Sequence, residues 1–516
     1  MSSNVVATPH RLSAQAGRGV LESGGNAVDA AIAIVAAQGV VAPETCGLGG
    51  DLFALVHALG WERPQALNAS GRSGSKVDAE ELRSRGHLEI PRDHPAAVTI
   101  PGCVDGLVEL SSRLGSVGLG EALTPAINFA EEGFEVSTEQ AAAFARQTEI
   151  YGTHPAVAGF YPDGEAVRAG DIVSRPDLAQ TLRAVVSGGR ESFYGGVAGQ
   201  DIVAAIDGIT SSDLAVSQAE WVDPIGIEVR GLTAWTTPPN SQGYLGPATL
   251  AVMDLLGVAD DPDDPVWWHS MIEGYRALAW ERDDIVADPD HVPLPVDLLL
   301  DPARLGRAAA SVDPTTAGVW PAASANGAGT AFMCVADADG MAVSIIQSNY
   351  HGTGSTFGTA RSGFLLQDRG RGFTLMPGHP NELGPGKRPL HTLSPTLWAE
   401  GNRPRWLIGT RGGNVQPQLI AQLAARAVMS GQPLAEAQGA PRWTIGGFGP
   451  GTRSHVVIEP GLPESITTEL ERRGHRISIA DGPQAGWGPM SIIELDGSSR
   501  RTAPDPRVDT TAALVF

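Results

Sequence analysis

The chain has 516 residues and a formal net charge of -22. Its length provides for several hydrophobic cores, and its 42% hydrophobic and 18% charged residues describe a compact globular protein, not a disordered or fibrous one. Nucleic acids and anionic membrane surfaces attract basic faces, so this acidic balance excludes both as expected partners.

The cysteines, the histidines and the start of the chain indicate whether disulfides, a metal site or a membrane segment are to be expected. Cys46, Cys103 and Cys334 form no CxxC pair and lie among apolar or small residues, so we expect buried, reduced thiols. The histidines show no HExxH or comparable ligand spacing, so neither a metal site nor another cofactor is expected. The start lacks an export signal, and no stretch approaches the ~18 apolar residues of a membrane helix. A cytoplasmic location is the resulting expectation.

The first part of the chain predicts helices around one buried strand. Residues 13–38 predict two helices, broken at Gly24 and Gly25, with Asn26 capping an alanine-rich second helix that is apolar on most sides. The glycine turn GLGGD, followed by the apolar run LFALVHAL, predicts a strand between residues 40 and 60. Residues 101 to about 305 have a mainly helical pattern.

A sharp change in composition follows. Residues 313–329 are small, polar and proline-bearing, which predicts a mobile connection. Two runs of alternating residues, TAFMCVA and MAVSIIQS, then flank an Asp-Gly turn, which is a strong hairpin signal. Antiparallel pairing about this turn places Thr330 across from Gln347, Ser348 or Asn349.

Thr330 has the chemistry of a nucleophile if the chain is cut before it. A threonine at a free N-terminus carries an α-amine, with a pKa of roughly 7.7 to 8.0 in peptides, that can take the hydroxyl proton. Cleavage between Gly329 and Thr330 would create this amine, and glycine tolerates the geometry that attack on its carbonyl requires. A Gly-Thr step that opens a strand is ordinary on its own, so the rest of the chain has to support this interpretation.

Ordered sequence blocks supply that support. Before the hairpin these are GVLESGGNAVDAAIA, PETCGLGGDLF, VTIPGCVDGL, LTPAINFAEEGF, FYGG and TPPNSQG; after it they are SGFLLQDR, GPGKRPLHTLSPT, IGTRGGN, APRW and APDPRVD. In this order, and nearly end to end, they resemble the γ-glutamyltransferase family of N-terminal-nucleophile hydrolases. The blocks are specific together, although no single one is.

The resemblance implies an α+β fold, a four-layer αββα sandwich. It implies a large subunit of residues 1–329 and a small subunit of residues 330–516, made from one precursor by cleavage at Gly329/Thr330 and intertwined in one fold. Thr330 matches the family nucleophile. Gly412 and Gly413 match the glycines whose backbone N–H groups form the oxyanion hole, which suits a diglycine turn because no side chain blocks its amides.

The candidate substrate pocket departs from family members that cleave glutathione. The positions that hold the substrate's ammonium group fall on Arg369 and Gly372, and a cationic residue repels an ammonium. The serine pair of those members becomes His391 and Thr392.

Three further residues complete the candidate substrate site. Ser348 and Asn349 are assigned to it from the hairpin register. Arg72 lies near the family arginine that binds a carboxylate; it is either such a partner or a solvated loop charge.

These residues favour a self-processing amidohydrolase that hydrolyses a small amide, or transfers its acyl group, through a Thr330 acyl-enzyme. The pattern resembles the glutathione-hydrolase-like and oxamate amidohydrolase branch, and it predicts an amide flanked by a carboxylate or another acceptor-rich group. The alternatives are a true γ-glutamyltransferase or glutathione hydrolase, a cephalosporin-type acylase with a more apolar pocket, and a non-enzymatic binding protein that has lost cleavage.

Overall fold

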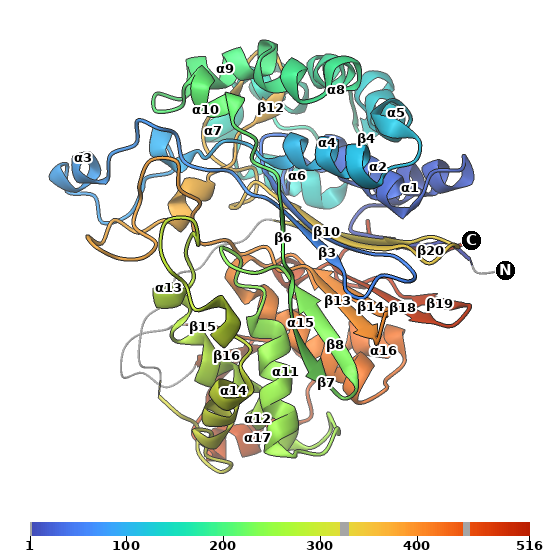
Figure 1. Cartoon of the computed structure of the whole chain (residues 1–516), viewed down its shortest axis with the longest axis vertical. Coiled ribbons are helices and arrows are strands. Elements are labelled where there is room, and N and C mark those ends of the chain that lie inside the picture. Colours follow the sequence, from blue (N-terminus) through green and yellow to red (C-terminus); the bar gives the residue numbers. More distant parts are fainter. Residues whose placement is uncertain (1–2, 320–329, 447–454) are drawn as a thin grey trace.

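The computed structural model describes residues 3–319, 330–446 and 455–516. Two sheets lie face to face in the middle of the molecule, and each is covered on its outer side by helices (Figure 1). The four layers, helix–sheet–sheet–helix, confirm the predicted α+β sandwich.

The first sheet has seven strands in the order β20-β1-β9-β10-β2-β3-β6. Its strands are β1 (Val5–Thr8), β2 (Asp51–His57), β3 (Gln65–Ala69), β6 (Glu220–Val222), β9 (Ala331–Ala336), β10 (Ala342–Ser348) and β20 (Ala512–Val515). All neighbouring strands in this sheet are antiparallel.

The second sheet has six strands in the order β19-β18-β14-β13-β8-β7. Its strands are β7 (Ile225–Val229), β8 (Leu232–Thr236), β13 (Thr396–Glu400), β14 (Arg403–Thr410), β18 (Met490–Asp496) and β19 (Ser499–Thr502). Both large sheets therefore contain strands from either side of residue 330.

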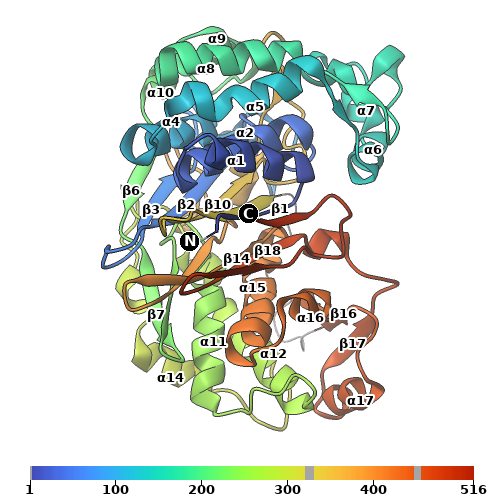
Figure 2. The same ribbon diagram turned by 90° about the vertical axis from the view of Figure 1, so that its right-hand side faces the viewer.

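The helices form the outer layers, as Figure 2 shows. Those over the seven-stranded sheet are α1 (Arg11–Glu22), α2 (Ala27–Val41), α4 (Cys103–Leu114), α5 (Gly118–Glu132), α8 (Pro176–Tyr194) and α9 (Val197–Ala205). Those below the six-stranded sheet are α11 (Leu245–Leu256), α12 (Pro265–Ala279), α14 (Pro302–Ala310), α15 (Gln416–Ala424) and α17 (Glu464–Arg472).

Shorter elements complete the fold. The short helices are α3 (Ala79–Ser84), α6 (Thr138–Ala145), α7 (Thr148–Tyr151), α10 (Ser211–Ala215), α13 (Arg282–Ile285) and α16 (Leu434–Gly439). Three small sheets are formed by β4 (Phe134–Glu135) with β5 (Ile172–Val173), by β11 (Gly358–Thr359) with β12 (Phe364–Leu365), and by β15 (Trp443–Gly446), β16 (His455–Ile458) and β17 (Arg476–Ile479).

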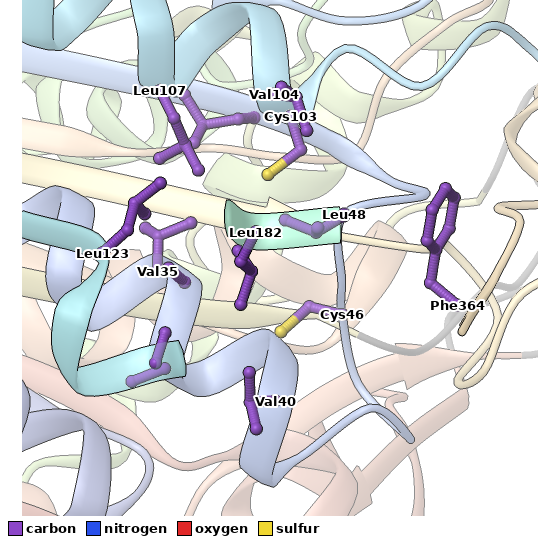
Figure 3. Close-up of a cluster of buried hydrophobic side chains, with 14 of the residues drawn as sticks. Val35, Val40, Cys46, Leu48, Cys103, Val104, Leu107, Leu123, Leu182 and Phe364 are labelled. Atoms are coloured by element: carbon purple, nitrogen blue, oxygen red, sulfur yellow. The ribbon is translucent and has the colours of Figure 1, made fainter. Parts of the chain in front are cut away.

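Helix α2 is the centre of the upper core. Asn26 caps it: its side chain accepts hydrogen bonds from the backbone of Val28 and Asp29, and the Asp29 carboxylate bonds back to the Asn26 N–H. Every residue of α2 is buried, as its mostly apolar surface predicts. The two thiols in Figure 3, Cys46 and Cys103, lie in this core, and Cys334 is also buried and free, as expected.

The predicted hairpin is confirmed, and its register decides which way each side chain faces. Ala331 pairs with Gln347 and Ala336 pairs with Ala342. Phe332 and Ile346 pack in the core between the two sheets, whereas residues 333, 335, 343 and 345 pack in the core under the helices. Because side chains alternate along a strand, Thr330 and Ser348 face the space between the sheets.

One expectation of the sequence is confirmed and one needs correction. Residues 101–305 are mainly helical, and they also contain β7 and β8, which form a hairpin turning through Arg230 and Gly231, both at positive φ (54° and 76°). The segment 313–319 is held in place instead of being mobile: the carbonyl of Asp313 contacts His269, and Ala317 donates to the carbonyl of Arg473. Residues 320–329, including Gly329, lie outside the described residues.

Within the described ranges, no helix is both long and apolar enough to cross a bilayer. The same ranges contain no group of three or more His, Cys, Asp or Glu side chains arranged to hold a metal ion. The expectation that the protein works without a metal stays a prediction.

Candidate active site

Thr330 lies immediately before β9 and is only 1% exposed. Its hydroxyl donates to the Ser348 hydroxyl oxygen, 3.2 Å away, and accepts from the Gln416 side-chain amide at 3.4 Å. The Ser348 oxygen also accepts from the backbone N–H of Tyr350 at 2.8 Å. The Thr330 oxygen is therefore positioned by two different elements, strand β10 and helix α15, as a nucleophile requires.

The diglycine turn lies between the end of β14 and the start of α15. Gly412 and Gly413 have φ values of 131° and 57°, which L side chains rarely adopt. Gln416, which contacts Thr330, is the first residue of α15, so the turn brings the N-terminal end of a helix close to the nucleophile. Free N–H groups and the helix dipole at this end favour a developing negative charge.

Arg369 is fully buried and reaches the same cluster. One guanidinium nitrogen donates to the Thr392 hydroxyl at 3.1 Å, another to the Ser348 hydroxyl at 3.4 Å, and the buried Nε has no partner. Within the described chain, no carboxylate lies within the 4.0 Å ion-pair distance of this guanidinium. Burial lowers the pKa of Arg369, which remains a cation at neutral pH because arginine starts so high.

The carboxylate beside Arg369 in the sequence is engaged elsewhere. Asp368 accepts from the His351 backbone at 3.0 Å, and its other oxygen lies 2.9 Å from the His351 ring and 3.4 Å from the Arg371 guanidinium. Arg369 instead stacks on the Tyr350 ring, with its guanidinium carbon 3.9 Å from the ring centroid. The direct contacts of the guanidinium are therefore a ring face and hydroxyl groups, and Asp51 and Asp368 act on its charge only from beyond ion-pair distance.

His391 is buried and does not present a free nitrogen to the site. Its Nδ1 accepts from the Leu393 N–H at 3.3 Å, so Nε2 carries the proton and donates to Asp51, 3.0 Å away. Burial and the nearby Arg369 lower the pKa of His391 to about 3. A neutral His391 thus ties Asp51 to the segment that carries Thr392, the partner of Arg369.

Two predicted site residues make their described contacts elsewhere. The Asn349 side chain donates to the Thr353 carbonyl at 3.3 Å, because strand alternation turns it away from Ser348. The Arg72 guanidinium pairs with Glu220 at 2.5 Å and with Asp290 at 3.4 Å. Arg72 is therefore neither in contact with Thr330 nor a solvated charge, and its substrate-binding role stays a prediction.

The site also contains residues that the sequence interpretation left out: Tyr350, Gln416 and Asp51. Strand alternation does not predict the place of Tyr350, because β10 ends at Ser348 and Tyr350 has a positive φ of 78°. Gln416 and Asp51 gave no signal either, because their positions depend on pairings across the fold.

Comparison with known proteins agrees with this geometry. A sequence profile of the family described as Gamma-glutamyltranspeptidase matches residues 13–515. The glutathione hydrolase-like YwrD proenzyme of Bacillus subtilis is 32% identical over 516 residues and aligns with 98% of each chain. The oxamate amidohydrolase proenzyme of Klebsiella pneumoniae is 34% identical over 517 residues, covering 98% of this chain and 97% of the relative.

A solved structure gives the same result for the fold. The cephalosporin acylase from Bacillus halodurans superposes with a TM-score of 0.91 at 32% identity, covering 100% of this chain and 96% of the acylase. The resemblance drawn from the sequence blocks is thereby confirmed. The chain belongs to the gamma-glutamyltranspeptidase family, whose members are self-processing hydrolases and acyltransferases.

Proposed function

We propose that the chain cuts itself before Thr330 and then hydrolyses a small amide whose acyl part carries a carboxylate. The observation that carries this proposal is the buried Arg369, which touches the Ser348 and Thr392 hydroxyls and has no carboxylate within ion-pair distance in the part of the chain that is described. A buried cation without an anion is costly, so a substrate anion is its natural partner.

Self-processing begins with the Thr330 hydroxyl. Its oxygen attacks the carbonyl carbon of Gly329, the C–N bond breaks, and the chain before Thr330 is transferred to the threonine oxygen as an ester. Water then cleaves this ester and leaves Thr330 with a free α-amine. The hydrogen bonds from Thr330 to Ser348 and from Gln416 to Thr330 support this step because they orient the attacking oxygen.

Turnover repeats the same chemistry on an external amide. The α-amine takes the hydroxyl proton, the Thr330 oxygen attacks the substrate carbonyl, and the amine delivers the proton to the leaving nitrogen. The N–H groups of Gly412 and Gly413 are assigned to the oxyanion that forms on the way. Water, or an acceptor amine, then releases the acyl group.

The acyl pocket favours an anion over the ammonium of a γ-glutamyl group. Arg369 repels a cation at the position where glutathione-active relatives hold one. At Gly372, a Cβ would lie 2.8 Å from the Leu390 carbonyl oxygen, so the backbone there leaves no room for an acidic side chain. The oxamate amidohydrolase relative, 34% identical, is named for a substrate that combines an amide with a carboxylate.

A substrate panel tests this assignment. The mature protein is given oxamate and succinamate as anionic amides, acetamide as a neutral one, and γ-glutamyl-p-nitroanilide as a donor with a free ammonium. We expect the highest kcat/KM for an anionic amide. Release of glutamate from the anilide as fast as any other amide is cleaved would contradict the proposal.

A cytoplasmic location and the absence of a nucleic-acid partner stay predictions from the sequence.

A further inference from the structure

Gln242 lies between the two halves of the candidate active site. It is fully buried in the segment between β8 and α11, in the part of the chain that precedes Thr330. Its side-chain amide nitrogen donates to the Thr392 carbonyl at 3.2 Å and to the Gly413 carbonyl at 3.1 Å. One amide group therefore joins the segment that contacts Arg369 to the diglycine turn.

The orientation of this amide follows from its neighbours. A guanidinium nitrogen of Arg282 donates to the Gln242 side-chain oxygen at 2.8 Å. Because a guanidinium can only donate and a carbonyl can only accept, the amide oxygen must face Arg282 and the amide nitrogen must face the two carbonyls. Each of the two amide hydrogens then has one carbonyl to bind.

The backbone around Gln242 is attached to one of the two segments that its side chain joins. The Gln242 N–H donates to the His391 carbonyl at 2.9 Å, and the Ser241 hydroxyl donates to the Leu393 carbonyl at 2.6 Å. Gln242 and residues 391–393 are therefore held together as one unit. The diglycine turn is the part that the Gln242 side chain holds against this unit.

The diglycine turn needs such support because glycine restricts its own backbone very little. The Gly412 carbonyl accepts from the Val415 N–H at 3.2 Å, and the Gly413 carbonyl accepts from Gln242 and from the Gln416 backbone. A trans peptide is planar, so holding these two carbonyls fixes the peptide planes on both sides of the Gly413 α-carbon. The Gly413 N–H lies in the first plane, and Gln242 holds the second.

The direction of the Gly413 N–H matters for the rate of acyl transfer. An oxyanion donor is effective when it already points to the place where negative charge develops, so that no reorganisation is needed during the reaction. Both peptide planes meet at the Gly413 α-carbon, and loss of either anchor lets this N–H tilt. The contact with Thr392 also fixes the turn relative to Arg369, where the acyl carboxylate is proposed to bind.

We infer that Gln242 is a positioning residue, which holds the Gly413 N–H in the direction that the oxyanion requires. This inference rests on the proposed function, because it concerns the oxyanion of the same acyl transfer to Thr330. Gln242 precedes the proposed cleavage point and the diglycine turn follows it. The large fragment therefore supplies the support for an oxyanion donor of the small fragment, and turnover requires that both stay together.

Gln438 provides a matched control. It is also fully buried, and its side-chain nitrogen donates to the carbonyls of Met490 at 3.1 Å and Ala503 at 3.2 Å. Its side-chain oxygen accepts from Arg442 at 3.1 Å. Within the described ranges, the side-chain hydrogen bonds of Gln438 go to these three residues. The same substitution thus removes equivalent hydrogen bonds at both positions, and only the loss at Gln242 concerns the diglycine turn.

The test compares Gln242→Met and Gln438→Met with the wild type after self-cleavage. The donor is the amide that the wild type turns over fastest among oxamate, succinamate and γ-glutamyl-p-nitroanilide. Intact mass counts the small fragments that begin with Thr330, and kcat is expressed per such fragment. We expect kcat to fall at least 10-fold in Gln242→Met with KM within threefold of the wild type. Both constants should stay within twofold in Gln438→Met.

Two inhibitors separate the direction of the N–H from the binding of the carboxylate. The boronic acid analogue of succinamate accepts an electron pair from the Thr330 oxygen, whose proton passes to the α-amine, and the tetrahedral adduct places a B–O group at the oxyanion position. Butanoate has the same carboxylate and no such group, so the ratio of the two inhibition constants cancels any change at Arg369. We expect the ratio of boronate to butanoate constants to rise about 10-fold in Gln242→Met and to stay unchanged in Gln438→Met.

The outcomes separate the two proposals. An unchanged kcat and inhibitor ratio in Gln242→Met, or an equal change in Gln438→Met, overturns the positioning role and leaves the proposed function in place. A wild type that turns over the anilide and no anionic amide overturns the proposed substrate, while kcat on the anilide still decides the role of Gln242. A wild type without cleavage and without turnover overturns both.

A second variant decides if Gln242→Met does not fold. Gln242→Glu has nearly the same shape and keeps an acceptor for Arg282, but its carboxylate has no hydrogen to donate to the Thr392 and Gly413 carbonyls. We expect the same fall in kcat and the same rise in the inhibitor ratio. Wild-type values of both in Gln242→Glu would overturn the positioning role.

Discussion

The guanidinium carbon of Arg369 lies 3.9 Å from the centroid of the Tyr350 ring, while the guanidinium nitrogens point to the hydroxyls of Thr392 and Ser348. The ring covers one face of the cation, and the nitrogens on its edge remain directed at the site. This arrangement holds a charge beside the nucleophile without neutralising it, which suits the recognition of a planar carboxylate.

Replacing Arg369 is predicted to weaken the binding of anionic substrates without lowering the stability of the folded protein. We expect Arg369→Met to lower kcat/KM for anionic amides by on the order of 100-fold, because a charge-assisted pair with the substrate is lost. Acetamide turnover should change much less. The melting temperature should stay level or rise, since an unpaired buried charge is removed. An equal loss of kcat/KM for neutral and anionic amides would show that Arg369 does not distinguish substrates by their charge.

Ser348 is predicted to support both processing and turnover. Ser348→Ala removes the acceptor of the Thr330 hydroxyl and a partner of Arg369, and we expect self-cleavage to slow by about 10-fold or more. The matched control is Ser344→Ala on the same strand and face, whose buried hydroxyl has no partner. A gel time course of precursor loss measures both. Similar rates in the two variants would count against the role given to Ser348.

The diglycine turn can be tested against a turn of the same conformation. Gly413 and Gly401 have φ values of 57° and 58°, so an alanine at either position pays a similar backbone cost of about 1–2 kcal/mol. We expect Gly413→Ala to lower kcat by at least 10-fold because it displaces an oxyanion donor. Gly401→Ala lies in an exposed turn with nothing within 4 Å of the added carbon, and it should keep full activity. Equal kcat values would remove the oxyanion role from Gly413.

The low pKa of His391 predicts that the free energy of unfolding decreases in acid. The pKa of His391 in the folded protein is about 3, below the ordinary value of 6.5. Between these two pH values the unfolded chain binds a proton at His391 and the folded chain does not. Stability is therefore complete above pH 6.5 and falls as the pH drops toward 3, by on the order of 1 kcal/mol per pH unit. His391→Gln should have a shallower decrease in melting temperature from pH 7 to pH 5. A titration of the His391 ring by NMR that showed protonation near pH 6.5 would contradict this.

The sequence predicted the parts of the site that are local in the chain. Asn26 and the alanine-rich run define α2 because capping and apolar periodicity act over a few residues. The Asp-Gly turn defines the hairpin, and its register alone brings Thr330 next to Ser348. The diglycine was found because family members share a motif that fits its chemistry.

The remaining parts depend on pairings that no local pattern encodes. His391 meets Asp51 across 340 residues, and Arg411 meets Glu139 across 272 residues. Arg72 was an open choice because its partner, Glu220, lies 148 residues away in β6, a strand that the helical pattern concealed.

The most direct test of the account is the N-terminal sequence and intact mass of the purified protein beside those of Thr330→Ala. We predict two fragments from the wild type, the smaller beginning with Thr330 and a free α-amine, and one uncut chain without amidase activity from Thr330→Ala. A wild-type protein that remains a single chain and hydrolyses amides, or a Thr330→Ala variant that does so, would contradict the central claim.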